Sequence, residues 1–242
     1  MNLPKLKRYQ KKYDYSYSFG AYPTLDLLKY HPDSVLEVLI KKDSHNSDGV
    51  KDIINICKKR KVIIEENDKA IDRISFKENT YVVGIFRKYE TKLQSGKNHI
   101  VLVNPSNLGN LGTIVRSMVG FNFNNLAIIG YGADIFDPTV VRSTMGGLFH
   151  INFCYFNNIE DYIKMFPKQN LYPFMLDGAE DIRKAKFVEP LSFIQGNEGS
   201  GLDSKYKNIG HSIFIPHSKN IDSLNLSVAT SIGLWEFSRR KS

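Results

Sequence analysis

Three polar, glycine-containing segments in the second half of the chain contain residue types that could bind a ligand or take part in catalysis. In the first, residues 104–116, Gly109 and Gly112 let the backbone come close to a neighbour or a ligand. Asn110 and Arg116 follow on an expected helix, less than two turns apart. Taken alone, the segment also fits an ordinary loop of Asn and Gly residues followed by a solvated arginine.

The second segment, residues 191–202, runs from an apolar strand into a turn with three glycines, Gly196, Gly199 and Gly201, around Asn197 and Glu198. The free backbone N–H groups of such a turn can hold a polar ligand. The spacing is not that of a dinucleotide fingerprint and no Walker lysine follows, so the pattern argues against a nucleotide-phosphate site. A tight turn with an exposed glutamate is the plain alternative.

The third segment, residues 213–229, leads into a helix that continues almost to the C-terminus. Asp222 or Ser223 is the expected N-cap of this helix. Val228, Ile232 and Trp235 are expected to form its buried stripe. The segment could therefore be nothing more than a core helix with its lead-in.

Short apolar strands must position these segments. Five are expected in the second half, at residues 100–103, 126–129, 172–176, 191–194 and 212–215. Near-continuous apolar strands between helices indicate a parallel sheet that is covered on both faces. Ligands of such sheets bind at the carboxyl ends of the strands, where all three segments lie.

The first part of the chain has a separate α/β pattern. Strands are expected at residues 34–40, 61–65 and 79–86, and a helix at 48–59. The polar stretch 89–98 contains Ser-Gly and reads as a linker. The sequence thus predicts a small α/β domain with its linker over residues 1–92 and a larger parallel-sheet domain over 93–242.

Composition narrows the class of protein. The net charge of +8 suggests a polyanionic partner. Residues 1–90 hold 18 Lys and Arg against 13 Asp and Glu, with basic runs at 5–12 and 58–61, although solvated faces explain such runs equally well.

Cys57 and Cys154 belong to no metal-binding motif, and we expect no metal and no disulfide. No apolar run approaches the ~18–20 residues of a membrane span, and the N-terminus lacks a signal-peptide pattern, so we expect a cytoplasmic protein without membrane contact.

Together the three segments resemble, in order, the signature motifs of the SpoU (TrmH-like) family of RNA 2′-O-ribose methyltransferases, within the SPOUT superfamily. The resemblance covers residues 99–242. The matching residues are Asn110, Gly112 and Arg116 for the first motif, Gly196, Asn197, Glu198, Gly199, Gly201 and Leu202 for the second, and Ile215, Pro216, Ser223, Leu224, Asn225, Leu226, Ser227 and Ala229 for the third. One departure is His217, where the family usually has methionine after Ile-Pro. The N-terminal part more weakly resembles the small RNA-binding domain that precedes many such catalytic domains.

The resemblance implies a methyltransferase domain with a trefoil knot, an S-adenosylmethionine cofactor, an rRNA or tRNA substrate and a homodimer that completes the active site. It implies catalytic roles for Arg116 as positioner and electrostatic activator, for Asn110 in orienting the ribose or that arginine, and for Glu198 and Asn225 in holding the arginine and substrate. The residues that it assigns to the cofactor are Gln195, Gly196, Asn197, Gly199, Ile215, Pro216, His217, Ser223 and Leu224.

Two other functions compete with this interpretation. One is an RNA-binding protein of the same fold without methyl transfer, against which the joint presence of the four catalytic candidates argues. The other is an α/β enzyme that uses NAD, which rests on the glycine-rich turn alone and lacks the fingerprint spacing.

Overall fold

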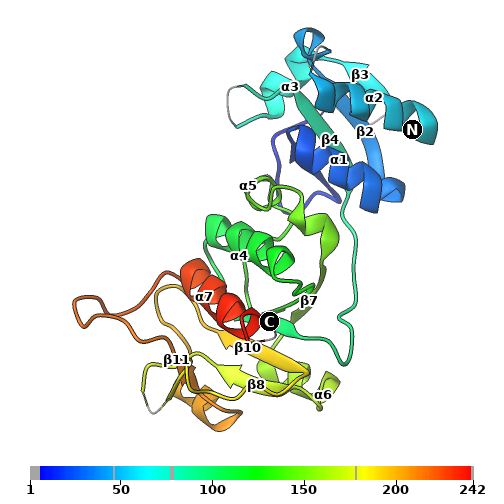
Figure 1. Ribbon diagram of the computed structural model, residues 1–242. Helices are drawn as coiled ribbons and strands as arrows, with labels where there is room; N and C mark the ends of the chain where they lie inside the picture. Colours follow the sequence, from blue (N-terminus) through cyan, green and yellow to red (C-terminus); the bar gives the residue numbers. More distant parts are fainter. Residues whose placement is uncertain (1–5, 46, 77–78, 178, 241–242) are drawn as a thin grey trace. The chain divides into compact units, whose positions relative to one another are not determined.

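The computed structural model describes residues 6–45, 47–76, 79–177 and 179–240 (Figure 1). Lys5, part of the first basic run, lies outside them. The chain forms two compact units, one of Met1–Tyr89 with Asp134–His150 and one of Glu90–Ala133 with Ile151–Ser242. None of the helices in the described ranges combines the length and the apolarity that a membrane span requires.

The first unit is built on a four-stranded sheet in the order β1-β4-β2-β3. Pairing is antiparallel between β1 and β4 and between β4 and β2, and parallel between β2 and β3. The strands are β1 (Tyr15–Phe19), β2 (Val35–Ile40), β3 (Ile64–Glu66) and β4 (Val82–Arg87). The helices are α1 (Ala21–Tyr30), α2 (Asp48–Arg60) and α3 (Asp68–Ile74), with short 3₁₀ turns η1 (Pro32–Ser34) and η2 (Lys42–Ser44).

Alternation along the central strands gives this sheet two cores. Val38 and Ile40 of β2 pack with Ile53 of α2, whereas Leu39, between them, packs with Ile71 of α3. Successive side chains of a strand point to opposite faces, so both faces are covered. The basic run at 58–61 lies at the end of α2, where cations favour the helix dipole.

The segment Asp134–His150, which we expected in the second domain, belongs to the first compact unit. It contains α5 (Pro138–Ser143) and the 3₁₀ turn η3 (Gly147–His150), and α5 packs on β1. Asp134 pairs with Lys88 at 3.3 Å and His150 with Asp26 at 3.1 Å. The expected boundaries at 92 and 93, as limits of functional domains, stay a prediction.

The second unit holds a five-stranded, wholly parallel sheet in the order β7-β6-β5-β10-β8. Its strands are β5 (His99–Val103), β6 (Asn125–Ile129), β7 (Asn152–Phe156), β8 (Asn170–Pro173) and β10 (Leu191–Gln195). Its helices are α4 (Leu108–Gly120), α6 (Ile159–Met165) and α7 (Leu226–Ser238), with the 3₁₀ turn η4 (Ser204–Asn208). The α/β class and the parallel sheet are as predicted.

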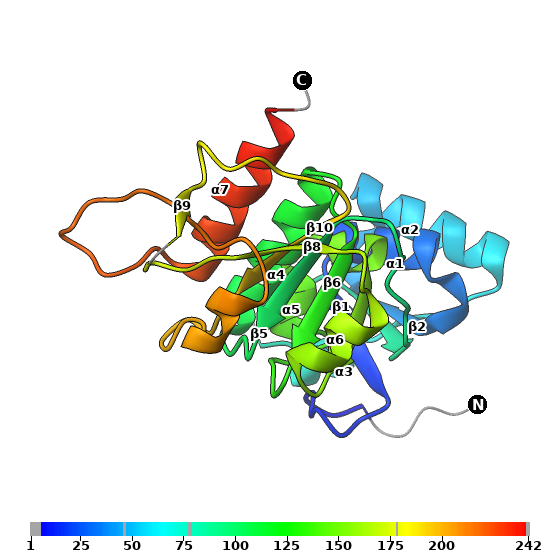
Figure 2. The same ribbon diagram turned by 90° about the horizontal axis from the view of Figure 1, so that it is seen from below.

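Both faces of this sheet are covered. Tyr162 of α6 packs with Val101 and Ile129 on one face. On the other, α7 lies beside α4 (Figure 2). The ring of Phe237 on α7 meets that of Phe193 on β10 edge to face. Complete burial on both sides explains why β5, β6 and β10 read as continuous apolar runs.

Three expectations for this unit were wrong. The strand expected at 212–215 is not in the main sheet: β11 (Ile213–Phe214) pairs with β9 (Glu180–Asp181), and Ile213 bridges Phe174 just beyond β8. Asn225, rather than Asp222 or Ser223, caps α7. Val228 and Trp235 are about half exposed instead of buried, because α7 is apolar on most sides and its periodicity does not select the packed face.

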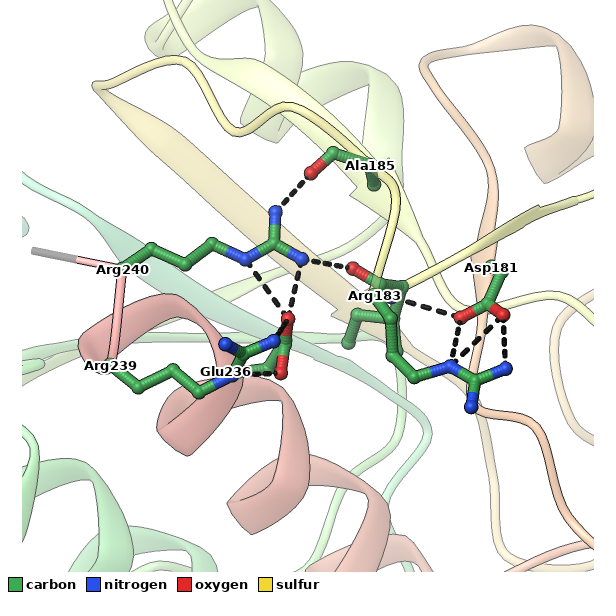
Figure 3. Close-up of polar contacts among 7 residues, drawn as sticks. Asp181, Arg183, Ala185, Glu236, Arg239 and Arg240 are labelled. Atoms are coloured by element: carbon green, nitrogen blue, oxygen red, sulfur yellow. Dashed lines mark hydrogen bonds and ion pairs between the residues drawn. The ribbon is translucent and has the colours of Figure 1, made fainter.

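The end of α7 is fixed by a cluster of arginines and carboxylates (Figure 3). Buried Glu236 accepts hydrogen bonds from Arg239 and Arg240. Arg240 also donates to the carbonyl oxygens of Ile182, at 2.7 Å, and Ala185. This cluster ties the last helix to the segment that follows β9.

Candidate functional site

The candidate site lies at the carboxyl edge of the parallel sheet. The strands β5 and β10 are neighbours, so the loops that follow them leave the sheet side by side. The loop after β5 carries Ser106 and the start of α4, and the loop after β10 carries Glu198. Asn225, at the start of α7, joins them through hydrogen bonds.

The carboxylate of Glu198 organises the loop after β5. Its Oε2 accepts from the backbone N–H of Ser106 at 3.1 Å and from the Ser106 hydroxyl at 2.9 Å. Its Oε1 accepts from the backbone N–H of Asn107 at 3.1 Å and from Asn110 Nδ2 at 3.3 Å. Burial would raise the pKa of Glu198, but the hydrogen bonds from these backbone amides outweigh it and lower the pKa. Glu198 is therefore an anion held by neutral donors.

A chain of amides extends this network to α7. Asn225 Oδ1 accepts from the backbone N–H of Ser227 at 2.9 Å as the N-cap, so its Nδ2 is free to donate to Asn110 Oδ1 at 3.1 Å. With its oxygen engaged, Asn110 directs its own Nδ2 to Glu198. The three sequence segments thus meet in one continuous set of hydrogen bonds.

Asn197 shapes the turn after β10. Its Nδ2 donates to the carbonyl oxygen of Asn104 at 2.8 Å, and its Oδ1 accepts from the backbone N–H of Gly199 at 2.9 Å. A Cβ at position 196 would collide with the backbone of Gly201, so Gly196 is required by the close approach of the two sides of the turn.

A cleft of about 400 Å³ opens beside this turn. Ligand sites in proteins commonly have volumes of about 300–1,000 Å³. Of the residues that the motifs assign to a cofactor, those that line the cleft are Gln195, Gly196, Asn197, Gly199, Ile215, His217, Ser223 and Leu224. Glu198 also lines it. The segment after β8, from Phe174 to Asp177, forms another wall that the sequence analysis missed, although strand ends at this edge were the signal that could have found it.

Two polar groups of the cleft have defined hydrogen-bonding roles. The buried side chain of Gln195 accepts from the Thr230 hydroxyl, and its Nε2 has no hydrogen-bond partner among the described residues. His217 Nδ1 lies 2.8 Å from the carbonyl oxygen of Ile215. Because a carbonyl only accepts, this ring nitrogen carries the proton. An unsatisfied buried donor is costly, and a polar ligand in the cleft would satisfy it.

Arg116 is not part of this network. It lies on α4 about 9 Å along the axis from Asn110 and is exposed. Across the described ranges it makes no hydrogen bond or ion pair. The structure therefore brings Asn110, Glu198 and Asn225 together and leaves the guanidinium available to a molecule outside this chain.

No group of three or more His, Cys, Asp or Glu side chains among the described residues could hold a metal ion. The network consists of amides, hydroxyls, backbone groups and the carboxylate of Glu198. The lining of the cleft also includes Asp177, Asp222, Lys207, His217 and apolar side chains. Such a site can orient polar groups and bind an organic ligand.

Residues 97–235 match the model of the SpoU rRNA Methylase family. A curated relative, the 23S rRNA (uridine(2479)-2′-O)-methyltransferase of Streptomyces viridochromogenes, is 27% identical over 57% of this chain and 50% of its own length. The 23S rRNA (guanosine(2553)-2′-O)-methyltransferase RlmP of Bacillus subtilis is 25% identical over 59% of this chain and 58% of its own. The chain thus spans little more than half the length of these relatives.

Solved structures match over more of the chain. The AdoMet-bound rRNA methyltransferase of Sinorhizobium meliloti is 27% identical, with a TM-score of 0.80 over 94% of this chain and 88% of that one. The SpoU methyltransferase AviRb of S. viridochromogenes is 20% identical, with a TM-score of 0.81 over 94% and 90%. The second likeness is one of fold.

Proposed function

The chain belongs to the SpoU rRNA Methylase family, and on that premise we propose that it transfers a methyl group from S-adenosylmethionine to a ribose 2′-hydroxyl of RNA. The observation that carries the proposal is the hydrogen-bonded chain Glu198–Asn110–Asn225 at the rim of the cleft. It links all three motif segments, and it is formed entirely by groups of the protein itself.

The cleft fits S-adenosylmethionine in size and chemistry. Phe174 and Leu226 offer apolar surface to a purine, and the unpaired Nε2 of Gln195 offers a donor. The glycine-rich turn exposes backbone close to a ligand. S-adenosylmethionine, when bound, supplies a methyl group on a cationic sulfur that is already a good leaving group, so the residues need only bind the cofactor, orient the ribose and favour loss of the hydroxyl proton.

The remaining task falls to the ribose hydroxyl, a poor nucleophile at neutral pH. Arg116 would position the ribose and its phosphate and favour the developing alkoxide by its charge, and a phosphate oxygen of the RNA would accept the hydroxyl proton. Asn110, itself oriented by Glu198 and Asn225, would hold the hydroxyl in line with the methyl carbon. Glu198, whose oxygens already accept five hydrogen bonds, acts through position rather than as the proton acceptor.

The proposed partner is RNA, either rRNA or tRNA. Because these RNAs are present in the cytoplasm, we propose that the protein is cytoplasmic. The S. meliloti, S. viridochromogenes and B. subtilis proteins are named as rRNA methyltransferases, which supports this substrate class. The excess of basic residues over 1–90 suits a phosphate backbone.

We further propose a homodimer and a trefoil knot, as the family resemblance implies. Support for the homodimer comes from α7, on which Val228 and Trp235 are 47% and 54% exposed. Large apolar side chains on one helix in water indicate an interaction surface. A second copy covering this helix would bring the exposed Arg116 of the neighbouring α4 close to the same interface.

Calorimetric titration of the full chain with S-adenosylmethionine tests the proposal. We expect saturable binding that is retained in Met165→Ala, a control at an exposed end of α6. Absence of binding at millimolar cofactor by folded protein would refute it. Binding of RNA without cofactor would instead favour an RNA-binding protein of the same fold.

A further inference from the structure

Tyr131 is the fully exposed aromatic residue of the second unit. Its side chain is 100% exposed, and it makes no ring contact with any residue that the structure describes. It stands in the loop that follows β6, between Gly130 and Gly132. A tyrosine ring held wholly in water contributes nothing to the core of the fold.

The loop that presents this ring is held firmly. The backbone N–H of Tyr131 donates to Asn104 Oδ1 at 3.1 Å, and that of Ala133 donates to the carbonyl oxygen of Pro105 at 2.7 Å. The Tyr155 hydroxyl donates to the carbonyl oxygen of Ala133 at 3.1 Å. Gly130 has a φ of +75°, and a Cβ there would collide with the Asn104 side chain. Backbone contacts therefore fix the base of an otherwise free ring.

The same contacts tie the ring to the candidate site. Asn104 accepts from Tyr131 through its side chain and from Asn197 of the glycine-rich turn through its carbonyl oxygen, at 2.8 Å. The strand β6 is separated from β10 by β5 alone, so the ends of β6 and β10 lie about 10 Å apart along one sheet edge. Neighbouring nucleotides of one RNA strand can bridge this span.

We propose that Tyr131 stacks on a base of the RNA next to the nucleotide held at Asn110 and Arg116; the proposal rests on the proposed function. A flat, exposed ring on a rigid loop is what a base needs as a stacking surface. The loop residues beside it are two glycines and a small alanine, so they add no apolar patch of the kind that a protein partner would cover. The stacked base fixes where the strand lies along the sheet edge, and with it which ribose reaches the cleft.

Steady-state methyl transfer to total RNA from cells that lack the gene tests this, with full-length protein and labelled S-adenosylmethionine. Removing a base-stacking ring typically costs about 1–3 kcal/mol, which is about 5- to 150-fold in affinity. Tyr131→Ala should raise the KM for RNA by that factor and leave the KM for S-adenosylmethionine unchanged. Tyr131→Phe and Tyr131→Trp should restore the KM to within about threefold, because the flat ring is what stacks.

Met165→Ala is the matched control. Met165 is 60% exposed at the end of α6, which leads into β8 and so lies at the amino edge of the sheet. It should leave both KM values unchanged. A wild-type KM for RNA in Tyr131→Ala, with active wild-type protein, would overturn this proposal alone. Loss of the dimer in Tyr131→Ala with an unchanged KM for RNA would place a second copy of the chain on the ring and also overturn it. Inactive, cofactor-free wild-type protein would overturn it together with the proposed function.

Discussion

Glu198 and Glu236 are both carboxylates whose pKa lies below the usual range, yet the two regions that hold them differ in charge. Neutral donors, both backbone amides and side chains, surround Glu198 at the rim of the cleft. Two guanidinium groups surround Glu236 at the end of α7 (Figure 3). For Glu236, burial would raise the pKa and the hydrogen bonds from Arg239 and Arg240 lower it by more.

This difference separates the arginines that pair with carboxylates from Arg116, which does not. An arginine bonded to a carboxylate is already neutralised, which suits a structural tie between α7 and the segment after β9. Glu198 is satisfied without a cation, and Arg116, on the exposed side of α4, has no hydrogen bond or ion pair to any residue that the structure describes. An unpaired positive charge on the helix that also carries Asn110 suits a site that must stabilise a developing alkoxide. The following predictions test that division.

The largest effect is expected for Arg116→Ala. Loss of one preorganised charge at a site of developing negative charge typically costs about 10²–10³ in rate, so single-turnover methyl transfer should fall by at least that factor. Arg116→Lys keeps the charge but loses the planar fork and should rescue little. Cofactor affinity should not change in either variant.

Arg183→Ala serves as the control for Arg116, because Arg183 is bonded to Asp181 and belongs to the structural arginines. Near-normal transfer by Arg116→Ala would remove Arg116 from the mechanism.

Glu198→Gln should be the next most severe. A Gln amide places an N–H where Glu198 now accepts from Ser106 or Asn107, so one contact becomes a clash of two donors. This clash should displace the loop after β5 and the side chain of Asn110. We expect kcat to fall about 10- to 100-fold, because a small misplacement of a positioning group can lower the rate by that factor. Unchanged kcat would show that the network does not position the substrate.

Glu236→Gln should affect stability rather than activity. Removing the charge leaves two arginines without their anion, one of them partly buried at 26% exposure. We expect a loss of about 1–3 kcal/mol in the free energy of unfolding by urea, with methyl transfer per folded molecule retained. Glu160→Gln, whose pair with Lys205 is long and exposed, should change stability by less than about 0.5 kcal/mol. Equal effects from the two variants would contradict the structural role of the cluster.

The smallest effect concerns Glu37 of the first unit, a buried carboxyl that forms no ion pair with a cation among the described residues. Burial and a hydrogen bond shared with Glu65 raise its pKa to about 7. A raised folded-state pKa contributes stability below the unfolded value of about 4.5, and that contribution is lost as the pH rises through about 7. Glu37→Gln should therefore flatten the decline of Tm between pH 4.5 and 8 and stabilise the protein by about 1 kcal/mol at pH 8. An unaltered pH profile would contradict this assignment.

Local patterns and the ordered motifs predicted much of the second unit. The strands β5, β6 and β10 lie where continuous apolar runs placed them, and the family resemblance is confirmed by the match over residues 97–235. The fold class is confirmed too. The family resemblance, with its motifs at strand ends, predicted one site for Asn110 and Glu198, and the structure joins the two by a hydrogen bond.

Other features depend on contacts that a sequence does not display. Asn and Ser are equally good N-cap residues, so the sequence does not distinguish Asn225 from Ser223. In the structure Asn225 is the N-cap of α7, and its side chain also donates a hydrogen bond to Asn110. The segment Asp134–His150 has no pattern that says which sheet it packs on. The aromatic strand β7 lacks the aliphatic run by which its neighbours were found. The knot and the dimer stay predictions.

Nucleoside mass spectrometry of RNA methylated in vitro tests the central claim most directly. Total RNA from cells without the gene would be incubated with full-length protein and S-adenosylmethionine that carries a deuterated methyl group, then digested to nucleosides. The label should appear in a 2′-O-methylated nucleoside when the wild-type protein is used. It should be absent from that nucleoside when Arg116→Ala protein is used. Label on a base, or no label with folded protein that binds the cofactor, would contradict ribose methylation by this chain.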